Sequence, residues 1–256
     1  MAIADRLAEA AGLWRSIRVY RLDRAHHRAM DALYRGFVHR DDLVFDIGAH
    51  VGDRIAAFRR LGARVVALEP QPGPAAVIRL LHGRDRAVVL RREAAGDRTG
   101  TLTLRVNSRN PTVTTGSADF VAAADGAAGW EGQVWDKTLT VPLTTLDALI
   151  AAHGLPAFVK IDVEGLEDAV LAGLSVPVPV LSFEFTTIGR DVARRAMARL
   201  VALSFARFNV ALGETQVLVF DLPIDAAAML AYLEALPQSA NSGDVYAFAG
   251  RRGETP

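Results

Sequence analysis

The sequence predicts an α/β fold with a mostly parallel, seven-stranded sheet and helices on both of its faces. Between residues 42 and 203, short apolar segments alternate with segments of helical periodicity, which is typical of parallel strands joined by crossover helices. The first apolar segment, 43–47, runs into a turn with two glycines, as a strand-to-helix turn of an α/β protein does. Because apolar residues make up 51% of the 256 residues, the chain can bury a full core.

Hydrophobic periodicity places the elements in order along the chain. Short runs rich in Val, Ile, Leu and Phe predict the strands of the sheet. Residues 101–106 alternate between polar and apolar side chains, which predicts an antiparallel or edge strand. The strands expected in the sheet are 43–47, 64–68, 87–90, 158–163, 178–185, 217–220 and 245–248. The expected helices are 54–61, 74–81, 146–153, 166–174 and 194–203.

Segments outside this alternation define the domain organisation. Apolar residues at helical spacing predict that residues 1–40 form a helical extension ahead of an α/β domain at 41–250. Residues 251–256 are expected to form a flexible tail. Within the domain, residues 107–137 show little periodicity but include two tryptophans. Two interpretations of this segment stay open: a lid or substrate loop, or a tolerated surface insertion.

Charge and cysteine content exclude several classes of protein. Lys plus Arg and Asp plus Glu both number 29, so no overall field draws the chain to nucleic acid, and no nucleic-acid partner is expected. The absence of cysteine excludes a disulfide framework, a thiolate metal site and a thiol nucleophile. Apolar runs stay short of the roughly 18 residues that a spanning helix requires. We therefore expect a cytoplasmic protein without a membrane span, and a homo-oligomer stays open.

The turn after the first strand is the first candidate binding site. Asp46, Gly48 and Gly52 stand where a parallel strand turns into a helix, and α/β sheets bind ligands at such strand ends. The two glycines do not have the G-x-G-x-x-G spacing of a dinucleotide site. Asp46 would repel a pyrophosphate but suits a cationic or zwitterionic ligand such as S-adenosylmethionine. The alternative is a tight turn without a ligand.

The next two strands end at residues suited to a nucleoside. Glu69 follows the second strand, about 20 residues after Asp46, where an α/β nucleotide site places an acid against ribose hydroxyls. Pro70 favours an extended backbone at Glu69. After the third strand, Ala95 leaves room for a flat adenine, and Asp97 could accept a hydrogen bond from its amino group. A turn with an Asx hydrogen bond is an equal alternative for Asp97.

Two more acids follow a buried strand at the start of a helix. Asp162 and Glu164 stand at the end of the predicted strand 158–163, on the ligand side of the sheet. Burying acids is costly unless they are paired, hydrogen-bonded or used in function. We therefore predict that both face the ligand. Glu184, near the end of the next strand, is a reserve candidate.

Taken together, these motifs resemble the FkbM-like family of class I S-adenosylmethionine-dependent methyltransferases. The matching stretches occur in the family's order and cover about residues 42 to 185. The resemblance implies a Rossmann-like class I methyltransferase fold, S-adenosylmethionine as cofactor, and O-methylation of a hydroxyl on a small metabolite, sugar, glycan or polyketide. The stretches that carry the resemblance are 45–52, 67–70, 94–97, 141–147 and 160–167.

By position, the resemblance assigns cofactor binding to matching residues of this chain. His50 departs from the family, which commonly has Asn at this position. A neutral imidazole can replace an amide as a hydrogen-bond partner, so we expect cofactor binding to survive, and catalytic use of His50 stays open. The predicted cofactor site consists of Asp46, Gly48, His50, Gly52, Glu69, Pro70, Ala95, Asp97 and Asp162.

Methyl transfer requires an in-line nucleophile and a destination for the acceptor proton. We expect Asp162 or Glu164 to orient the acceptor hydroxyl and act as general base, with Glu184 in reserve. The same carboxylates could instead hold a divalent cation that lowers the acceptor's pKa. Metal-free chemistry is favoured, and no metal ligand is predicted, because the sequence has no D-x-D or His-rich cluster.

Two other classes of function stay open. A nicotinamide-dependent oxidoreductase would use the same fold, although the glycine spacing and the lack of a Tyr-x-x-x-Lys pair speak against it. A catalytically inactive module could keep the cofactor pocket and nothing more. A comparison of S-adenosylmethionine binding with NAD binding distinguishes a methyltransferase from an oxidoreductase.

Overall fold

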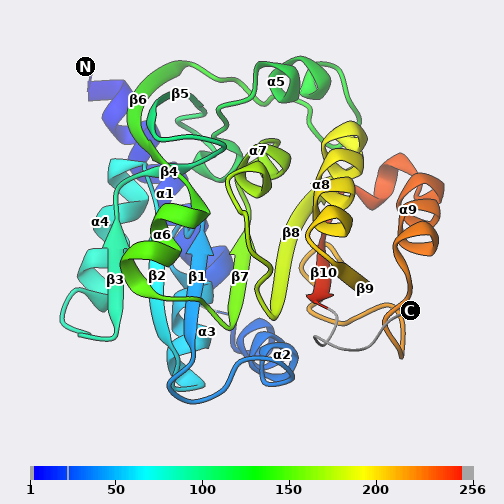
Figure 1. The fold of residues 1–256 in the computed structure, drawn as a ribbon. Coiled ribbons are helices and arrows are strands. Elements are labelled where there is room, and N and C mark those ends of the chain that lie inside the picture. The colour runs from blue at the N-terminus through cyan, green and yellow to red at the C-terminus, as the bar shows by residue number, and fades with distance from the viewer. Residues whose placement is uncertain (1–2, 22, 250–256) are drawn as a thin grey trace.

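Seven strands form the main sheet at the centre of the molecule (Figure 1). The computed structural model describes residues 3–21 and 23–249. The strands are β1 (Leu43–Ile47), β2 (Arg64–Leu68), β3 (Val88–Arg91), β7 (Phe158–Ile161), β8 (Val180–Thr186), β9 (Phe205–Leu212) and β10 (Ser242–Ala249). Their order across the sheet is β3-β2-β1-β7-β8-β10-β9. All neighbours pair in parallel except β10, which is antiparallel to both β8 and β9. The predicted mostly parallel, seven-stranded sheet is confirmed.

Strand β1 is the point where the strand order reverses. It pairs with β2 on one side and with β7 on the other, and all five of its residues are buried. Ligands of open α/β sheets bind beyond the carboxyl ends of the strands at such a switch point. The turn predicted to bind the ligand therefore lies at the position that the topology favours.

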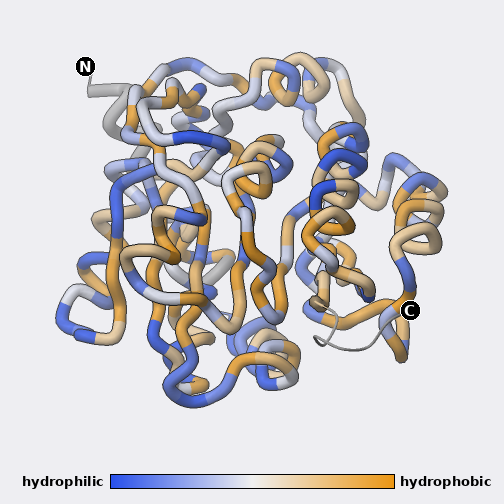
Figure 2. The backbone as a smooth tube through the Cα atoms, viewed as in Figure 1, coloured by the Kyte–Doolittle hydropathy of each residue, from blue (hydrophilic) through white to orange (hydrophobic). Residues whose placement is uncertain are grey.

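Helices cover both faces of this sheet. One layer consists of α2 (Arg24–Tyr34), α3 (Asp53–Arg60) and α4 (Pro72–His82), and its core includes Val44 of β1. The other layer consists of α6 (Leu146–His153), α7 (Glu167–Ala172), α8 (Arg190–Ala202) and α9 (Ala226–Ala235), and its core includes Phe45 and Ile47. Successive strand residues point to opposite faces, so β1 serves both layers in turn. Figure 2 shows the hydrophobic residues gathered along these strands.

Short polar side chains start several of the helices. The carboxylate of Asp23 accepts a hydrogen bond from the backbone N–H of Ala25 at the start of α2, at 2.8 Å. Thr145 accepts one from Ala148 at the start of α6, at 3.1 Å. Such caps satisfy backbone donors that have no partner within the helix. They explain why α6 begins where the sequence predicted.

A second, three-stranded sheet lies beyond the carboxyl ends of β1 and β2 (Figure 1). It consists of β4 (Ala94–Ala95), β5 (Gly100–Val106) and β6 (Lys137–Thr144) in the order β4-β6-β5. The β5 strand is antiparallel to β6, as its alternating pattern predicted. It does not join the edge of the main sheet. The segment between β5 and β6 holds a 3-10 turn, Pro111–Val113, and the short helix α5 (Ala118–Ala124).

The N-terminal helix α1 (Ile3–Arg21) packs close to this inserted segment. Gly12 lies against the backbone carbonyls of Ser108 and Arg109, where a side chain would have no room. α1 also contacts α4. In the described part of the chain, no helix is both long enough and apolar enough to cross a membrane.

The prediction of a closing strand at 217–220 is wrong. The sheet instead contains β9 (Phe205–Leu212), which starts twelve residues before the predicted strand. Residues 217–220 contribute an isolated bridge between Leu218 and Ala211. The side chain of Asn209 replaces regular pairing there: its Nδ2 donates to the carbonyl of Phe220, and its Oδ1 accepts from the N–H of Phe220. Arg207 and Asn209 interrupt the apolar run of β9, which conceals it from a hydrophobicity pattern. The expected tail at 251–256 lies outside the described residues.

Candidate functional site

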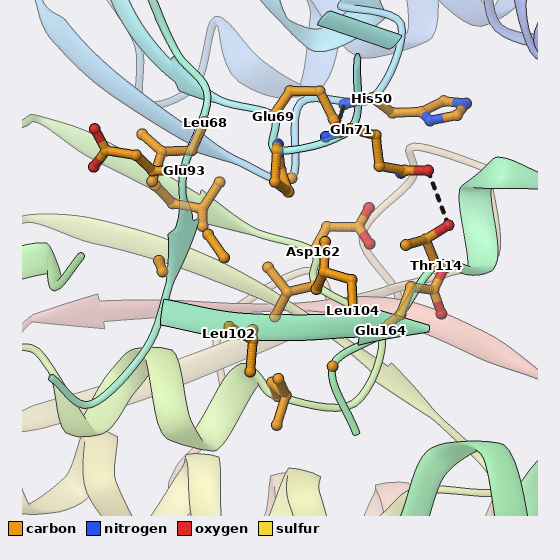
Figure 3. A pocket seen from close by; sticks show the side chains of 18 of the residues that line it. His50, Leu68, Glu69, Gln71, Glu93, Leu102, Leu104, Thr114, Asp162 and Glu164 are labelled. Carbon is orange, nitrogen blue, oxygen red and sulfur yellow. Dashed lines mark hydrogen bonds between the residues drawn. The ribbon is translucent and has the colours of Figure 1, made fainter. Parts of the chain in front are cut away.

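Two adjoining pockets lie beyond the carboxyl ends of the central strands. The first pocket contains seven of the predicted site residues, and Figure 3 shows several of these side chains around it. The second pocket shares His50, Asp162 and Glu164 with the first and adds Glu184. The predicted residues that line the first pocket are Gly48, His50, Glu69, Pro70, Ala95, Asp162 and Glu164.

The turn after β1 depends on Gly48. Its φ is +86°, a left-handed conformation, and a Cβ here would overlap the carbonyl oxygen of Asp162. The backbone N–H groups of Gly48 and Ala49 both donate to the carbonyl of Leu68, at 3.0 and 2.9 Å. Glycine is required because the ends of β1, β2 and β7 converge at this residue. Gly52 also has a positive φ, of +76°, but starts α3 and lines neither pocket.

Glu69 joins the turn after β1 to the turn after β2. Its Oε2 accepts a hydrogen bond from the N–H of His50 at 2.9 Å, and its Oε1 accepts one from the N–H of Gln71 at 2.8 Å. The side chain is buried. Burial raises the pKa of Glu69 to about 8, although the two backbone N–H groups oppose this. Each carboxylate oxygen keeps a lone pair for a ligand hydroxyl.

Gln71 connects the pocket to the inserted segment. Its Oε1 accepts from the hydroxyl of Thr114 at 2.9 Å, and its Nε2 donates to the carbonyl of Pro111 at 3.1 Å. Thr112 and Thr114 line the first pocket, which places the inserted segment at the site. The sequence prediction missed Gln71, because its partners lie about 40 residues away along the chain. Its position directly after Glu69 and Pro70 was the one available signal.

One end of the first pocket is apolar. Leu102 and Leu104, two residues apart in β5, face it (Figure 3). Leu166 lines the same pocket. Ala95 of β4 and Val163 also line this pocket. The sequence prediction included Ala95 but not the leucines, since strand alternation shows which residues share a face and not what that face meets.

Three carboxylates gather where the two pockets meet. One oxygen from each of Asp162, Glu164 and Glu184 lies within 4.8 Å of the others. Burial raises the pKa of Glu164 and of Glu184 well above the usual range, and the nearby charge of Asp162 adds to this. Burial also opposes ionisation of Asp162, but the ammonium group of Lys160 holds the pKa of Asp162 below its ordinary value.

Lys160 supplies the charge beneath this cluster. Its Nζ lies 2.6 Å from Oδ2 of Asp162 and 3.8 Å from Oδ1 of Asp244, and its side chain is 2% exposed. Burial would lower the pKa of Lys160, but these two carboxylates raise it well above the usual value. A buried ammonium requires such partners. Lys160 was not predicted as a site residue, although it stands within a matching stretch.

The loop from Asp162 to Gly165 is held by buried hydrogen bonds. Glu164 has a φ of +57°, which is rare for a residue with a side chain. The carboxylate of Glu167 accepts from the N–H groups of Val163 and Gly165, each at about 3.1 Å. The hydroxyl of Thr115 donates to the carbonyl of Glu164 at 2.5 Å. These bonds impose a strained conformation, and such strain is typical of functional sites.

The second pocket is strongly polar. Arg54 lies at its wall, with Nη1 2.5 Å from Oδ2 of Asp53 and Nη2 3.0 Å from Oε2 of Glu214. Trp130, from the inserted segment, adds an aromatic ring to the lining. Carboxylates and an indole suit a ligand with hydroxyl groups and an apolar ring face.

A family model decides among the functions that this geometry allows. The model described as the methyltransferase FkbM domain matches residues 46–196, more than half of the chain. The chain belongs to this methyltransferase family. Its members transfer methyl groups from S-adenosylmethionine, which confirms the cofactor predicted from the sequence. No curated protein matches the chain significantly.

Solved structures similar to this methyltransferase are distant from it in sequence. An O-methyltransferase from Bacillus cereus in complex with SAH is 12% identical, with 98% of this chain and 92% of that chain covered and a TM-score of 0.49. A TehB-like SAM-dependent methyltransferase from Corynebacterium glutamicum is 10% identical, with coverage of 96% and 99% and a TM-score of 0.46. The family match, and not these similarities, identifies the chain.

Besides Gly52, two predicted residues of the methyltransferase lie outside both pockets, Asp46 and Asp97. Asp46 follows Val44 on the α3 face of β1, is 1% exposed, and its carboxylate has no hydrogen-bond partner among the described residues. Strand alternation turns it away from the face of Phe45 and Ile47. The side chain of Asp97 is about half exposed and pairs with Arg98 at 3.1 Å. Direct cofactor contact by Asp46 and Asp97 is not supported by this placement.

The burial of Asp46 predicts how the stability of the apo-methyltransferase depends on pH. Burial raises the pKa of Asp46 from 3.8 to about 7. A carboxyl group whose pKa is raised by folding stabilises the fold fully at pH values below its pKa in the unfolded chain. This stabilisation is lost as the pH rises through its pKa in the folded protein. Asp46→Asn should therefore be similar to wild type at pH 4 and more stable by up to about 4 kcal/mol at pH 8. Urea unfolding across this range measures the difference.

The matched control is Asp97→Asn, which removes an exposed carboxylate. It should follow the wild-type stability at every pH, because an exposed ion pair contributes little. If Asp46→Asn also parallels wild type between pH 4 and pH 8, Asp46 is not the buried acid that limits stability at high pH.

Proposed function

We propose that this chain binds S-adenosylmethionine in the first pocket and transfers its methyl group to a hydroxyl of a small molecule in the second pocket. The observation that carries the proposal is the junction of the two pockets. His50, Asp162 and Glu164 line both, so a donor in one and an acceptor in the other would meet at these side chains. Close approach of the two reacting groups is the main requirement of an in-line transfer.

The first pocket has the chemistry that this cofactor needs. Its apolar end, with Leu102, Leu104 and Leu166, suits a flat adenine. Glu69 offers free lone pairs to ribose hydroxyls, and Glu164 has a buried oxygen, Oε2, without a partner among the described residues. The cofactor supplies an electrophilic methyl group on a positively charged sulfur, which also favours the ionised form of carboxyl groups beside it. Gly48, His50 and Pro70 complete the proposed cofactor site.

The carboxylates at the junction receive the acceptor. Asp162, ionised beside Lys160, is suited to accept a hydrogen bond and orient the acceptor hydroxyl. Its lowered pKa makes it a weak base. Glu164 and Glu184, whose pKa values burial raises, are stronger proton acceptors once ionised. We assign orientation to Asp162 and proton acceptance to Glu164, with Glu184 as the next candidate.

His50 can share in positioning the acceptor. Burial lowers the pKa of His50, so its imidazole is neutral at neutral pH. Its Nε2 lies 3.5 Å from the hydroxyl of Thr112, at the place where the inserted segment closes over both pockets. A neutral imidazole there can donate to or accept from an acceptor hydroxyl.

The inserted segment 107–137 is proposed to cover the site and help to choose the acceptor. Its Trp130 is buried, packs edge-to-face on Phe120 at 5.1 Å between ring centroids, and lines the second pocket. Trp135 donates from Nε1 to the carbonyl of Val113 at 2.9 Å. A segment with its own small core is held in place at the site, unlike a tolerated surface insertion. A Trp130→Ala variant tested on a series of acceptors checks this assignment.

Separate measurement of binding and turnover tests the proposed function. Asp162→Asn and Glu164→Gln should lower kcat about 100-fold or more, since each removes a group that acts on the acceptor proton. Their affinity for S-adenosylmethionine, measured by calorimetry, should change much less than kcat. Full turnover in both variants would eliminate the assignment. Binding of S-adenosylmethionine without methyl transfer to any hydroxyl acceptor would favour an inactive cofactor-binding module.

A further inference from the structure

We propose that Asp162, Glu164 and Glu184 form a binding site for a divalent cation at the junction of the two pockets. Asp162 and Glu164 come from the loop after β7, and Glu184 comes from the neighbouring strand β8. All three line the second pocket. The cation would therefore lie where the acceptor binds.

The spacing of the carboxylate oxygens fits one ion. Oxygen ligands lie about 2.0 to 2.6 Å from Mg²⁺ or Ca²⁺, so two ligands of one ion are at most roughly 5 Å apart. One oxygen from each of the three residues lies within 4.8 Å of the others. A single cation can contact all three without a change in the backbone.

An unpartnered buried carboxylate points independently to a ligand. Glu164 is 7% exposed, and its Oε2 has no hydrogen-bond partner among the described residues. Oε2 of Glu184 is buried and equally without a partner in the described part of the chain. Buried polar atoms of native proteins are almost always satisfied. A cation satisfies both oxygens at once, which one neutral hydroxyl group cannot do.

Two negative charges of the site are not compensated by basic side chains of the described residues. Among the described residues, Lys160 pairs with Asp162, and Arg54 is already committed to Asp53 and Glu214. Within the described part of the chain, Glu164 and Glu184 form no ion pair with a basic side chain, and two carboxylates side by side repel each other. A divalent cation compensates these two charges. Lys160 contacts Oδ2 of Asp162, which leaves Oδ1 for the ion.

The loop that presents two of the ligands is held in position before any ion binds. Glu167 accepts hydrogen bonds from the N–H groups of Val163 and Gly165, and Thr115 donates to the carbonyl of Glu164. These bonds impose the left-handed backbone of Glu164, with its φ of +57°. Residues that orient ligands in this way strengthen a metal site, because less order must be gained on binding.

The donor set selects the kind of ion. Three carboxylates offer only oxygen, which suits hard cations such as Mg²⁺, Mn²⁺ and Ca²⁺. Three protein ligands leave coordination positions open for water or an acceptor hydroxyl. An effect of the ion on turnover rests on the proposed function: a bound cation lowers the pKa of a coordinated hydroxyl, and Glu164 then acts as a ligand of the ion in place of accepting the proton. Binding of the ion does not depend on methyl transfer.

Terbium luminescence tests the site directly. Tb³⁺ replaces Ca²⁺ at oxygen sites, and Trp130 lines the same pocket, so excitation of tryptophan should produce saturable Tb³⁺ emission in wild type. Glu164→Gln and Glu184→Gln should weaken this binding about tenfold or more. Glu214→Gln is the matched control, because Glu214 lines the pocket outside the cluster; its Tb³⁺ affinity should equal that of wild type. Trp130→Phe should reduce the emission but not the affinity for Mn²⁺ measured by electron paramagnetic resonance.

Two results would overturn the cation site. One is the absence of saturable Tb³⁺ and Mn²⁺ binding up to millimolar concentration by a wild-type protein that is shown to be folded by circular dichroism. The other is binding that both glutamine variants retain at full affinity. Calorimetry with S-adenosylmethionine separates the two proposals. Cofactor binding and full turnover together with no saturable cation binding would leave the methyltransferase function standing and remove the cation, whereas cation binding without cofactor binding would do the reverse.

Discussion

Gly48→Ala is expected to destabilise the protein by more than about 3 kcal/mol and to abolish binding of S-adenosylmethionine. The new Cβ would overlap the carbonyl oxygen of Asp162, and the φ of +86° is itself unfavourable for alanine. Neither partner can move freely, because the N–H of Gly48 is bonded to Leu68 and the N–H of Asp162 to Ile47. Urea unfolding measures the stability, and calorimetry measures cofactor binding.

Gly126→Ala separates the overlap from the effect of backbone conformation. Gly126 has a φ of +71°, but a Cβ there would meet nothing within 4 Å. This variant should cost only about 1 kcal/mol, the strain of a left-handed alanine, and should bind the cofactor like wild type. Similar losses of stability for the two variants would show that the convergence of β1 and β7 at Gly48 is not tightly packed.

Lys160→Met is expected to destabilise the protein by roughly 3 kcal/mol at neutral pH and to reduce turnover strongly. Removal of a buried cation leaves its carboxylate partner uncompensated, and the side chain of Lys160 is 2% exposed. We expect the lower end of the usual range because the side chain of Asp162 is 32% exposed. Turnover should fall because Asp162 would lose the charge that keeps it ionised next to the acceptor.

The pH dependence of the stability lost in Lys160→Met follows from the ionisation of Asp162. Lys160 holds the pKa of Asp162 below its ordinary value. A carboxylate whose pKa is lowered by folding stabilises the fold at pH values above its pKa in the unfolded chain. This stabilisation is lost as the pH falls through its pKa in the folded protein. The penalty of Lys160→Met should therefore be large at pH 7 and shrink below about pH 4. Urea unfolding at pH 7 and at pH 4 gives both values.

The control for Lys160→Met is Arg98→Met, which removes the cation of the exposed pair with Asp97. It should change the free energy of unfolding by less than about 1 kcal/mol. An equally small effect of Lys160→Met at pH 7 would contradict a stabilising role for the buried pair.

Elements with strong local signals were predicted from the sequence. β1 and β2 occupy the predicted ranges 43–47 and 64–68, and α6 occupies 146–153. Each depends on residues within a few positions: an apolar run before a turn for the strands, and a Thr cap with a glycine end for the helix. The βα turns that carry Gly48 and Glu69 were located for the same reason.

Elements whose pairing is distant were missed or misplaced. β9 contains Arg207 and Asn209, so its hydrophobic pattern is broken, and its identity as a strand depends on pairing with β10 more than 30 residues later. The small sheet of β4, β5 and β6 depends on contacts across the whole inserted segment. Local propensity cannot predict such pairing, because the energy that stabilises a strand comes from its contacts with the neighbouring strand.

Sequence patterns alone place the glycines, Glu69 and the acids Asp162 and Glu164 just after buried parallel strands, and therefore on one edge of the sheet. The resemblance carried by these residues identified the family. Which side chains meet at that edge depends on the packing of the folded chain. This packing turns Asp46 toward α3, places Lys160 beneath Asp162, and brings Glu184 from β8 to the cluster. The physical reason is that the orientation and the pKa of a strand residue depend on the layer packed against it and on the charges of neighbouring strands, which are distant in the sequence.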